Sequence, residues 1–99
     1  MVFRAAACCL MLVASSISAS ATNVVELFTS QGCSTCPPAD RLLGQLSEDP
    51  DILALTFPID YWDYLGWKDT LGKDSFARRQ KFYAKARGDG QVYTPQVVI

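Results

Sequence analysis

The sequence predicts an α/β domain in which strand, helix, strand, helix and strand follow one another. Three observations support this prediction. Residues 24–28 and 52–57 are short apolar runs with the length of buried strands, and the first is rich in β-branched and aromatic side chains. Between the two runs, apolar side chains recur at the spacing of one helical face. Strand, helix and strand in this order normally form a right-handed unit with parallel strands.

The helix that follows the first strand is expected to begin beside two cysteines. Its apolar stripe consists of Ala39, Leu42, Leu43 and Leu46. Pro37 and Pro38 suit the first turn of a helix, because the N–H groups of that turn lack acceptors within the helix. Cys33 is therefore expected at the helix N-terminus and Cys36 one turn deeper, at the sheet edge where open α/β sheets bind their ligands.

Two thiols with a two-residue spacer in such a position are typical of a redox dithiol. The partial positive charge and free N–H groups of a helix N-terminus favour thiolate over thiol, which lowers a pKa that starts near ~8.5. Cys33 is the expected attacking thiolate, and Cys36 is expected to resolve the mixed disulfide. The spacing also keeps the two Cα atoms within the roughly 4.4–6.8 Å that a disulfide tolerates.

Other uses of the two cysteines remain open. A C-x-x-C pair can be half of a zinc site, or a static disulfide in a non-catalytic scaffold. Zinc would need carboxylates or a second protein, because the chain has no His and no other Cys after residue 21. A static disulfide closing so short a loop would add little stability by the loop-entropy argument. A different class of function is a binding module for a soft metal such as Cu(I), for which two thiolates can suffice.

Residues 1–21 have the features of a cleaved secretory signal peptide. Arg4 forms a basic start, the apolar stretch that follows is too short for a transmembrane helix, and Ala19 and Ala21 fit an A-x-A cleavage pattern. We place the cut after Ala21, with an uncleaved anchor as the alternative. Cleavage would remove the two other cysteines and leave a secreted or periplasmic chain without a membrane anchor. In an oxidising compartment, a dithiol can be held oxidised or cycled by partners.

The mature part, residues 22–99, is expected to be one small and incomplete domain. It carries 8 Lys and Arg against 10 Asp and Glu, a net charge of −2 that gives no indication of nucleic-acid binding. The chain stops at residues 97–99, inside what looks like a buried strand. A parallel strand there, with no partner hairpin and no closing helix, would leave an apolar edge uncovered. We therefore expect residues 22–99 to be the N-terminal part of a longer domain, a fragment.

Two further segments complete the predicted domain. Residues 60–69 hold both tryptophans and two of the four tyrosines, which is too aromatic for an ordinary solvated loop. They are expected to pack over the sheet end for stability or to contact a partner polypeptide beside the thiols, and both can hold at once. Asp74 and Ser75 are expected to cap a helix that runs to about Arg87 and ends at residues 88–90.

The order of these segments resembles the thioredoxin superfamily. In that superfamily a strand, a C-x-x-C at a helix start, a strand, a helix and a Thr-Pro dipeptide before another strand follow one another, and the dipeptide here is Thr94-Pro95. More narrowly, residues 25–40, 60–69 and 93–96 are similar to the secreted bacterial family called domain of unknown function 1223. Members of that family are longer than this chain, which agrees with a fragment.

The resemblance implies roles for residues away from the dithiol. Pro95 would be cis and would lie beside the two cysteines, with the Thr94 backbone shaping a groove where a substrate strand docks. The sequence alone predicts a trans bond, because X-Pro bonds are cis in only ~5–6% of cases. We expect the aromatic segment to bound the same groove through Tyr61, Trp62 and Trp67.

The resemblance also implies a role for an acidic residue in the first strand. Glu26 would be a buried proton acceptor behind the dithiol, although it lies one residue further from the first cysteine than the acid of thioredoxins. Burial would raise its pKa, as a base for the Cys36 proton requires. The alternative is a strand-end Glu that reaches solvent.

Together these observations predict the β-α-β-α-β portion of a thioredoxin-like α/β fold, acting as an exported thiol-disulfide oxidoreductase. Its expected partners are exported protein thiols or disulfides, or a redox partner protein, and it is expected to need no cofactor or metal. The direction of electron flow depends on the thiolate pKa and on the stability of each redox state. The spacer Ser34-Thr35, which replaces the Gly-Pro of thioredoxin, does not reveal that direction.

Overall fold

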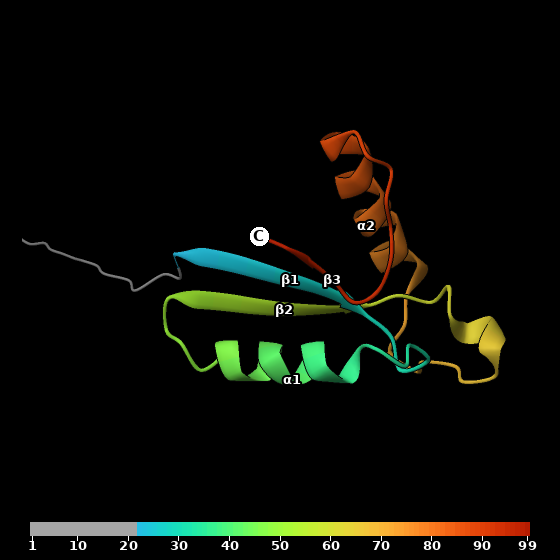
Figure 1. Ribbon diagram of the computed structural model, residues 1–99, viewed down its shortest axis with the longest axis horizontal. Coiled ribbons are helices and arrows are strands. Elements are labelled where there is room, and N and C mark those ends of the chain that lie inside the picture. The colour runs from blue at the N-terminus through green and yellow to red at the C-terminus, as the bar shows by residue number, and fades with distance from the viewer. Residues whose placement is uncertain (1–21) are drawn as a thin grey trace, which may run out of the picture.

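The computed structural model describes residues 22–99, which form a three-stranded mixed sheet with a helix on each face (Figure 1). The strands are β1 (Asn23–Thr29), β2 (Ile52–Pro58) and β3 (Gln96–Val98), and the helices are α1 (Pro37–Leu46) and α2 (Asp74–Arg87). A short 3-10 helix, η2 (Asp63–Leu65), lies between β2 and α2. The α/β class and the β-α-β-α-β order are confirmed. The expected signal peptide, residues 1–21, lies outside the described residues.

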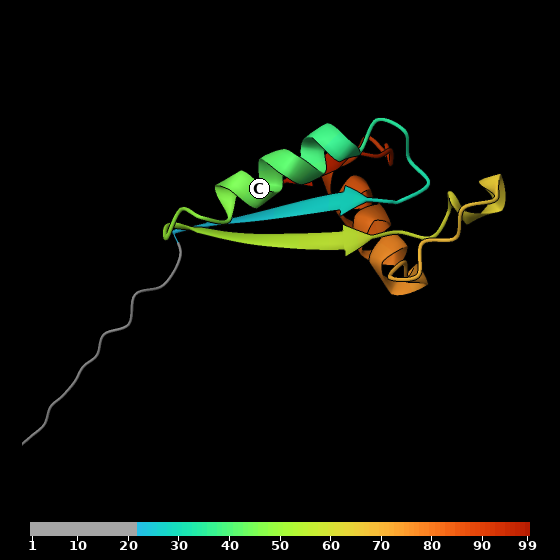
Figure 2. The same cartoon turned by 90° about the horizontal axis from the view of Figure 1, so that it is seen from below.

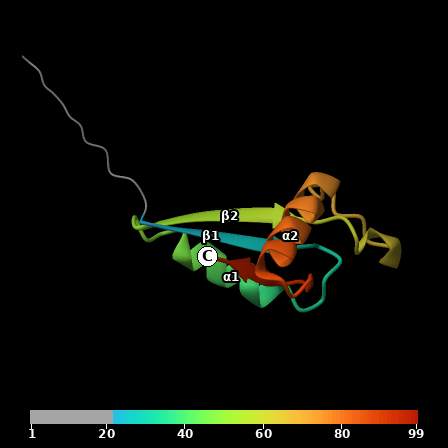
Figure 3. The ribbon, with the colours of Figure 1, turned by 90° about the horizontal axis from the view of Figure 1, so that it is seen from above.

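The central strand is β1, which pairs with β2 in parallel and with β3 in antiparallel orientation. Helix α1 runs back along the sheet to the start of β2, whereas α2 crosses the strands steeply (Figures 1 and 3). The chain therefore re-enters the sheet at the carboxyl end of β1, where Gln96 pairs with Phe28. The parallel orientation expected for the last strand is wrong, because α2 does not carry the chain back to the amino ends of the strands.

Side chains of β1 alternate between two apolar clusters, as the period of two in a strand requires. Val25 and Leu27 face α1 and pack against Leu43. Phe28 faces α2 and packs against Ile59 and Ala77. Figure 2 shows α1 and α2 on opposite sides of the sheet. Each helix is therefore held by burial of apolar surface on its own face of the sheet.

Helix α1 begins later than the dithiol pattern predicts. Its first two residues are Pro37 and Pro38, so Cys36 is the capping residue at its amino end. Cys33 lies three residues earlier, in a turn closed by the Cys36 N–H, which donates to the Cys33 carbonyl at 3.3 Å. The reason is that two consecutive prolines have no N–H to donate and fit only the first positions of a helix.

Helix α2 differs from expectation at its start and agrees with it at its end. Lys73 is the capping residue, so Asp74 and Ser75 lie in the first turn and do not cap the helix. Asp74 instead forms an ion pair with Arg78, one turn along. At the end, Gly88 has a φ of 89°, a left-handed conformation that glycine adopts without steric cost. None of the helices in residues 22–99 is both long and apolar enough to cross a bilayer.

Candidate redox site

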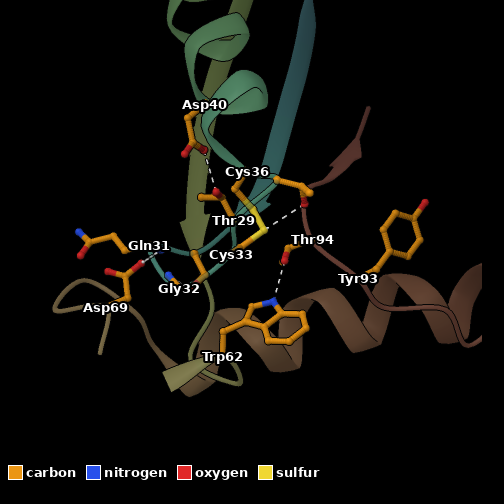
Figure 4. The surroundings of a disulfide bond; sticks show 12 residues. Thr29, Gln31, Gly32, Cys33, Cys36, Asp40, Trp62, Asp69, Tyr93 and Thr94 are labelled. Carbon is orange, nitrogen blue, oxygen red and sulfur yellow. Dashed lines mark hydrogen bonds between the residues drawn. A yellow bond between two sulfur atoms is a disulfide. The ribbon is translucent and has the colours of Figure 1, made fainter. Parts of the chain in front are cut away.

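Cys33 and Cys36 are joined by a disulfide at the carboxyl edge of the sheet (Figure 4). Their Cα atoms are 5.4 Å apart, within the range that disulfides span. The two residues differ in exposure, because Cys33 keeps 7% of its surface accessible and Cys36 keeps 0%. A thiol or disulfide that approaches from solvent can therefore reach Cys33 before Cys36.

The turn before Cys33 is tied to the aromatic loop, which we define as residues 60–69. The tie is Asp69, a buried residue at the end of that loop. Its Oδ2 atom accepts a hydrogen bond from the backbone N–H of Gln31 at 3.0 Å, and its Oδ1 atom accepts one from the N–H of Leu71 at 2.9 Å. In the sequence, Asp69 has no feature that sets it apart, because the aromatic side chains dominate this segment.

A close approach at Gly32 brings the aromatic loop against the turn. A Cβ atom at this position would lie 3.3 Å from the backbone oxygen of Trp67 and 3.4 Å from the Cβ atom of Trp62. The first distance is tighter than most Cβ contacts and the second is at the short end of ordinary van der Waals contact, so a side chain here would require the loop to shift by a few tenths of an ångström. Glycine at position 32 therefore allows the aromatic loop to lie directly beside the dithiol.

A groove of about 160 Å³ opens beside Cys33. It is lined by residues from the dithiol turn, the aromatic loop and the segment before β3: Gly32, Cys33, Ser34, Thr35, Trp62, Leu65 and Thr94. The indole N–H of Trp62 donates to Thr94 Oγ1 at 2.7 Å (Figure 4). Two segments that are far apart in the sequence are thus joined at the rim of the groove.

Only some of the residues expected at this groove line it. Trp62 and Thr94 line it, and Pro95 follows Thr94 through a cis peptide bond, the isomer that the resemblance implies. Tyr61 instead turns toward α2, where its hydroxyl donates to Gln80 Oε1 at 2.8 Å. Burial raises the pKa of the Tyr61 phenol, and this hydrogen bond lowers it in part.

Trp67 also lies away from the groove. It is 62% exposed, and its indole N–H donates to Gln31 Oε1 at 3.0 Å. Trp67 therefore contacts the turn before the dithiol from its solvent side, through the side chain of Gln31. The backbone N–H of Gln31 is the group that Asp69 binds. The aromatic loop thus packs against the core through Tyr61 and Trp62 and lies beside the dithiol through Trp62, whereas its contact with a partner polypeptide stays a prediction.

Glu26 does not lie behind the dithiol. Its carboxylate accepts hydrogen bonds from Arg79 at 2.8 and 3.1 Å and from the Tyr83 hydroxyl at 2.8 and 3.0 Å, both from α2. The Arg79 hydrogen bond outweighs burial and holds the pKa of Glu26 below its usual value. The expected rise in its pKa is wrong. The alternative of a solvent-reaching Glu also fails, because the residue is buried.

The physical reason for this placement is the alternation of a strand. Because successive side chains point to opposite faces, a shift of one residue moves a side chain to the other face of the sheet. Glu26 lies one residue further from Cys33 than the acid of the resembling superfamily, and so it faces α2. Leu27, its neighbour, faces α1 and is fully buried among apolar side chains.

The carboxylate nearest in sequence to the dithiol belongs to Asp40, one helical turn after Cys36. The hydroxyl of Thr29, the last residue of β1, donates to Asp40 Oδ1 at 2.7 Å (Figure 4). The Asp40 N–H donates to the Cys36 carbonyl at 2.9 Å. A negative charge in the first turn also favours helix formation. Asp40 thus connects the start of α1 to the end of β1, a contact between residues 11 positions apart that no local sequence pattern indicates.

The Glu26 pair predicts a loss of stability in acid. Because the pKa of Glu26 is lowered in the folded state, its contribution is present above the unfolded value near 4.5 and is lost as pH falls through the folded value. We expect Glu26→Gln to cost about 1–2 kcal/mol of unfolding free energy at pH 7. Urea denaturation at pH 7 and pH 3 should show this deficit shrinking in acid.

The matched control is Glu48→Gln, in the exposed turn after α1. It is expected to change stability at pH 7 by less than about 0.5 kcal/mol. A Glu26→Gln deficit that is equal at pH 7 and pH 3 would show that the Arg79 pair does not contribute through its charge.

The site has few groups that could hold a metal. Within residues 22–99, no group of three or more His, Cys, Asp or Glu side chains could bind a metal ion. Reduction of the disulfide would provide two thiolates, a set that suits Cu(I) but leaves Zn²⁺ without the further ligands of its usual tetrahedral site.

The chain matches the family model described as "Protein of unknown function (DUF1223)" over residues 24–99. It is also similar to the crystal structure of a structural-genomics protein from Agrobacterium tumefaciens, with 45% sequence identity and a TM-score of 0.76. That similarity covers 83% of this chain and 37% of the other, so the chain spans little more than a third of that protein. No curated protein matches. The family match covers most of the chain, which therefore belongs to the DUF1223 family of proteins of unknown function.

Proposed function

We propose that this protein is an exported thiol-disulfide oxidoreductase in which Cys33 attacks and Cys36 resolves. The observation that carries the proposal is the asymmetry of the pair. Cys33 lines an open groove, whereas Cys36 is fully buried behind it. A static disulfide does not require one sulfur to face a groove, whereas an exchange reaction requires one accessible and one protected thiol.

The proposed exchange begins with the reduced dithiol and a substrate disulfide. The Cys33 thiolate attacks one substrate sulfur, a mixed disulfide forms, and the other substrate sulfur leaves as a thiolate. The Cys36 thiolate then attacks the Cys33 sulfur, which forms the Cys33–Cys36 disulfide and releases the second substrate thiolate. Two electrons pass from the protein to the substrate, and the reverse sequence oxidises a substrate dithiol.

One nearby hydroxyl favours the Cys33 thiolate in this proposal. The Thr35 hydroxyl lies 3.5 Å from the Cys33 sulfur and can donate to a thiolate. This hydrogen bond stabilises the charged form and lowers the thiol pKa. Pro37 and Pro38 contribute no N–H at the start of α1, so the helix N-terminus offers fewer donors than usual.

The groove indicates the kind of partner. Its lining includes Trp62 and Leu65. Leu65 and the adjacent Tyr64 are exposed to solvent. Trp and Tyr side chains are common anchors in contacts with polypeptides. We therefore propose exported proteins with thiols or disulfides as partners. Export itself rests on the expected signal peptide in residues 1–21.

Alkylation of the reduced protein tests the proposal. We expect Cys33 to react with iodoacetamide faster than Cys36, with a pH midpoint below the ~8.5 of a free thiol. Peptide mapping by mass spectrometry between pH 4 and pH 10 measures both rates. Thr35→Val, which keeps the side-chain shape but removes the hydroxyl, is expected to move the Cys33 midpoint upward.

Equal alkylation of the two cysteines, with a Cys33 midpoint at the free-thiol value, would contradict the proposal. A lower melting temperature after reduction, without a reactive thiol, would then favour a structural disulfide. Tight one-to-one uptake of Cu(I) by the reduced protein, without disulfide exchange, would favour the metal-binding alternative.

A further inference from the structure

One buried amide connects the two segments that flank the dithiol groove. Gln80, in the middle of α2, has 0% of its surface exposed. Its Oε1 atom accepts the hydroxyl of Tyr61 at 2.8 Å. Its Nε2 group donates to the backbone carbonyl of Tyr93 at 2.8 Å and to Gln96 Oε1 at 2.7 Å. Both N–H bonds and the carbonyl oxygen of this amide are therefore used.

The partners of Gln80 are the immediate neighbours of groove residues. Tyr61 precedes Trp62 in the aromatic loop, and Tyr93 precedes Thr94 in the segment before β3. The hydrogen bond of 2.7 Å from Trp62 to Thr94 joins the same two segments at the rim. Figure 4 shows these two side chains on one side of the disulfide, with α2 passing behind Trp62. Gln80 thus connects the aromatic loop to the segment before β3 inside the protein, and the Trp62–Thr94 hydrogen bond connects the same two segments at the rim of the groove.

The chemistry of the contact requires an amide at position 80. A carboxylate would place an acceptor oxygen where Nε2 donates, facing the Tyr93 carbonyl and the Gln96 Oε1 atom, which both need a donor. A hydrocarbon side chain would leave the Tyr61 hydroxyl and the Tyr93 carbonyl without their partner in a buried place, which is costly. Glutamine provides the acceptor and both donors in one planar group.

We propose that Gln80 is a positioning residue of the dithiol groove. By fixing Tyr61 and Tyr93, it sets the separation of Trp62 and Thr94 and so the fit of the groove to the polypeptide around the attacked disulfide. This inference rests on the proposed exchange function for its consequence in catalysis. Gln80 itself does not line the groove.

The first test does not depend on activity. In the intact protein, Gln80→Met is expected to accelerate hydrogen exchange of the Trp62 indole N–H about tenfold, because the Trp62–Thr94 bond opens more often. The Trp67 indole is the internal reference, because it bonds to Gln31, outside the Gln80 network. NMR of tryptophan-labelled protein measures both signals. Gln45→Met, on the exposed side of α1, is the control and is expected to change neither.

A second variant keeps this test decisive if Gln80→Met does not fold. Tyr61→Phe removes one hydroxyl from the network and is expected to accelerate Trp62 exchange in the same direction. Unchanged Trp62 exchange in a folded variant of either kind overturns the inference. Equal acceleration of Trp62 and Trp67 also overturns it, because that result indicates general loosening.

The second test measures single-turnover oxidation of the reduced protein. The two probes are glutathione disulfide and a pair of ten-residue peptides joined by a disulfide. Gln80→Met is expected to raise the half-saturating concentration of the peptide probe about tenfold, with the maximal rate and the glutathione reaction within about twofold of wild type. An equal loss with both probes would contradict a positioning role.

The two proposals fail in different ways. If the wild-type protein oxidises with neither probe, the proposed exchange function fails, whereas the Trp62 measurement still tests the link through Gln80. If the wild-type protein reacts and the variant has the same half-saturating concentration, only the role of Gln80 is overturned.

Discussion

Phe28→Ala is expected to lower the unfolding free energy of the intact protein by about 3–5 kcal/mol, the usual cost of removing a fully buried ring. Phe28 has 0% of its surface exposed and lies in the central strand. Its ring centroid is 5.4 Å from that of Phe57 and 6.1 Å from that of Tyr83. The truncation would open a cavity between β1, β2 and α2, whose backbones cannot close it without losing their own contacts.

Chemical denaturation of matched variants measures this effect. Val24→Ala, in the same strand but 42% exposed, is expected to cost less than about 1 kcal/mol. Phe28→Leu, which keeps most of the volume, is expected to cost less than about 1.5 kcal/mol. Similar losses for Phe28→Ala and Val24→Ala would show that this cluster is not a main source of stability.

The features that could be predicted from the sequence are those that depend on local patterns. Two apolar runs, a helical stripe between them and two prolines after Cys36 predict the β-α-β unit and the place of the dithiol in it. These signals are local, because strand period, helix period and proline geometry act within a few residues. The segment Thr94-Pro95 needed the resemblance, since an X-Pro bond is trans by default.

Orientation across the sheet was harder to predict. The resemblance implies that Glu26 lies behind the dithiol, but one residue of offset places it against Arg79 on the other face of the sheet. The last strand was expected to be parallel, and it is antiparallel because α2 crosses the sheet. Both errors arise because the face on which a strand residue lies and the direction in which a helix runs depend on packing between distant segments.

Polar residues that organise the site were missed for a related reason. Gln80 contacts residues 13 to 19 positions away, and Asp69 holds a backbone group 38 positions away. In the sequence, each looks like an ordinary polar residue on a helix or in a loop. Burial alone distinguishes them, because a buried polar group needs partners. Burial becomes visible only when the fold is known.

The aromatic loop shows an intermediate case. Its composition correctly indicated a packed segment near the dithiol. Composition could not tell which rings would line the groove, and only Trp62 of the three expected aromatic residues does so. Tyr61 turns to Gln80, and Trp67 supports Gln31 from the outside. Each ring points toward its own hydrogen-bond partner, and those partners are distant in the sequence.

Removal of one cysteine at a time tests whether Cys33 attacks and Cys36 resolves. Cys36→Ser leaves the attacking thiol without its resolving partner, so the mixed disulfide should persist. Cys33→Ser leaves only the buried thiol and should form no such adduct. Both variants should lose multiple turnover, because each lacks one sulfur of the redox pair.

The direct measurement is non-reducing electrophoresis and peptide mapping of the intact variants after exposure to exported proteins. We predict adducts of Cys36→Ser that disappear on reduction and contain a partner cysteine joined to Cys33. We predict none for Cys33→Ser or for the double variant. Adducts that form equally through either cysteine, or the absence of adducts from Cys36→Ser, would contradict these roles of the two cysteines.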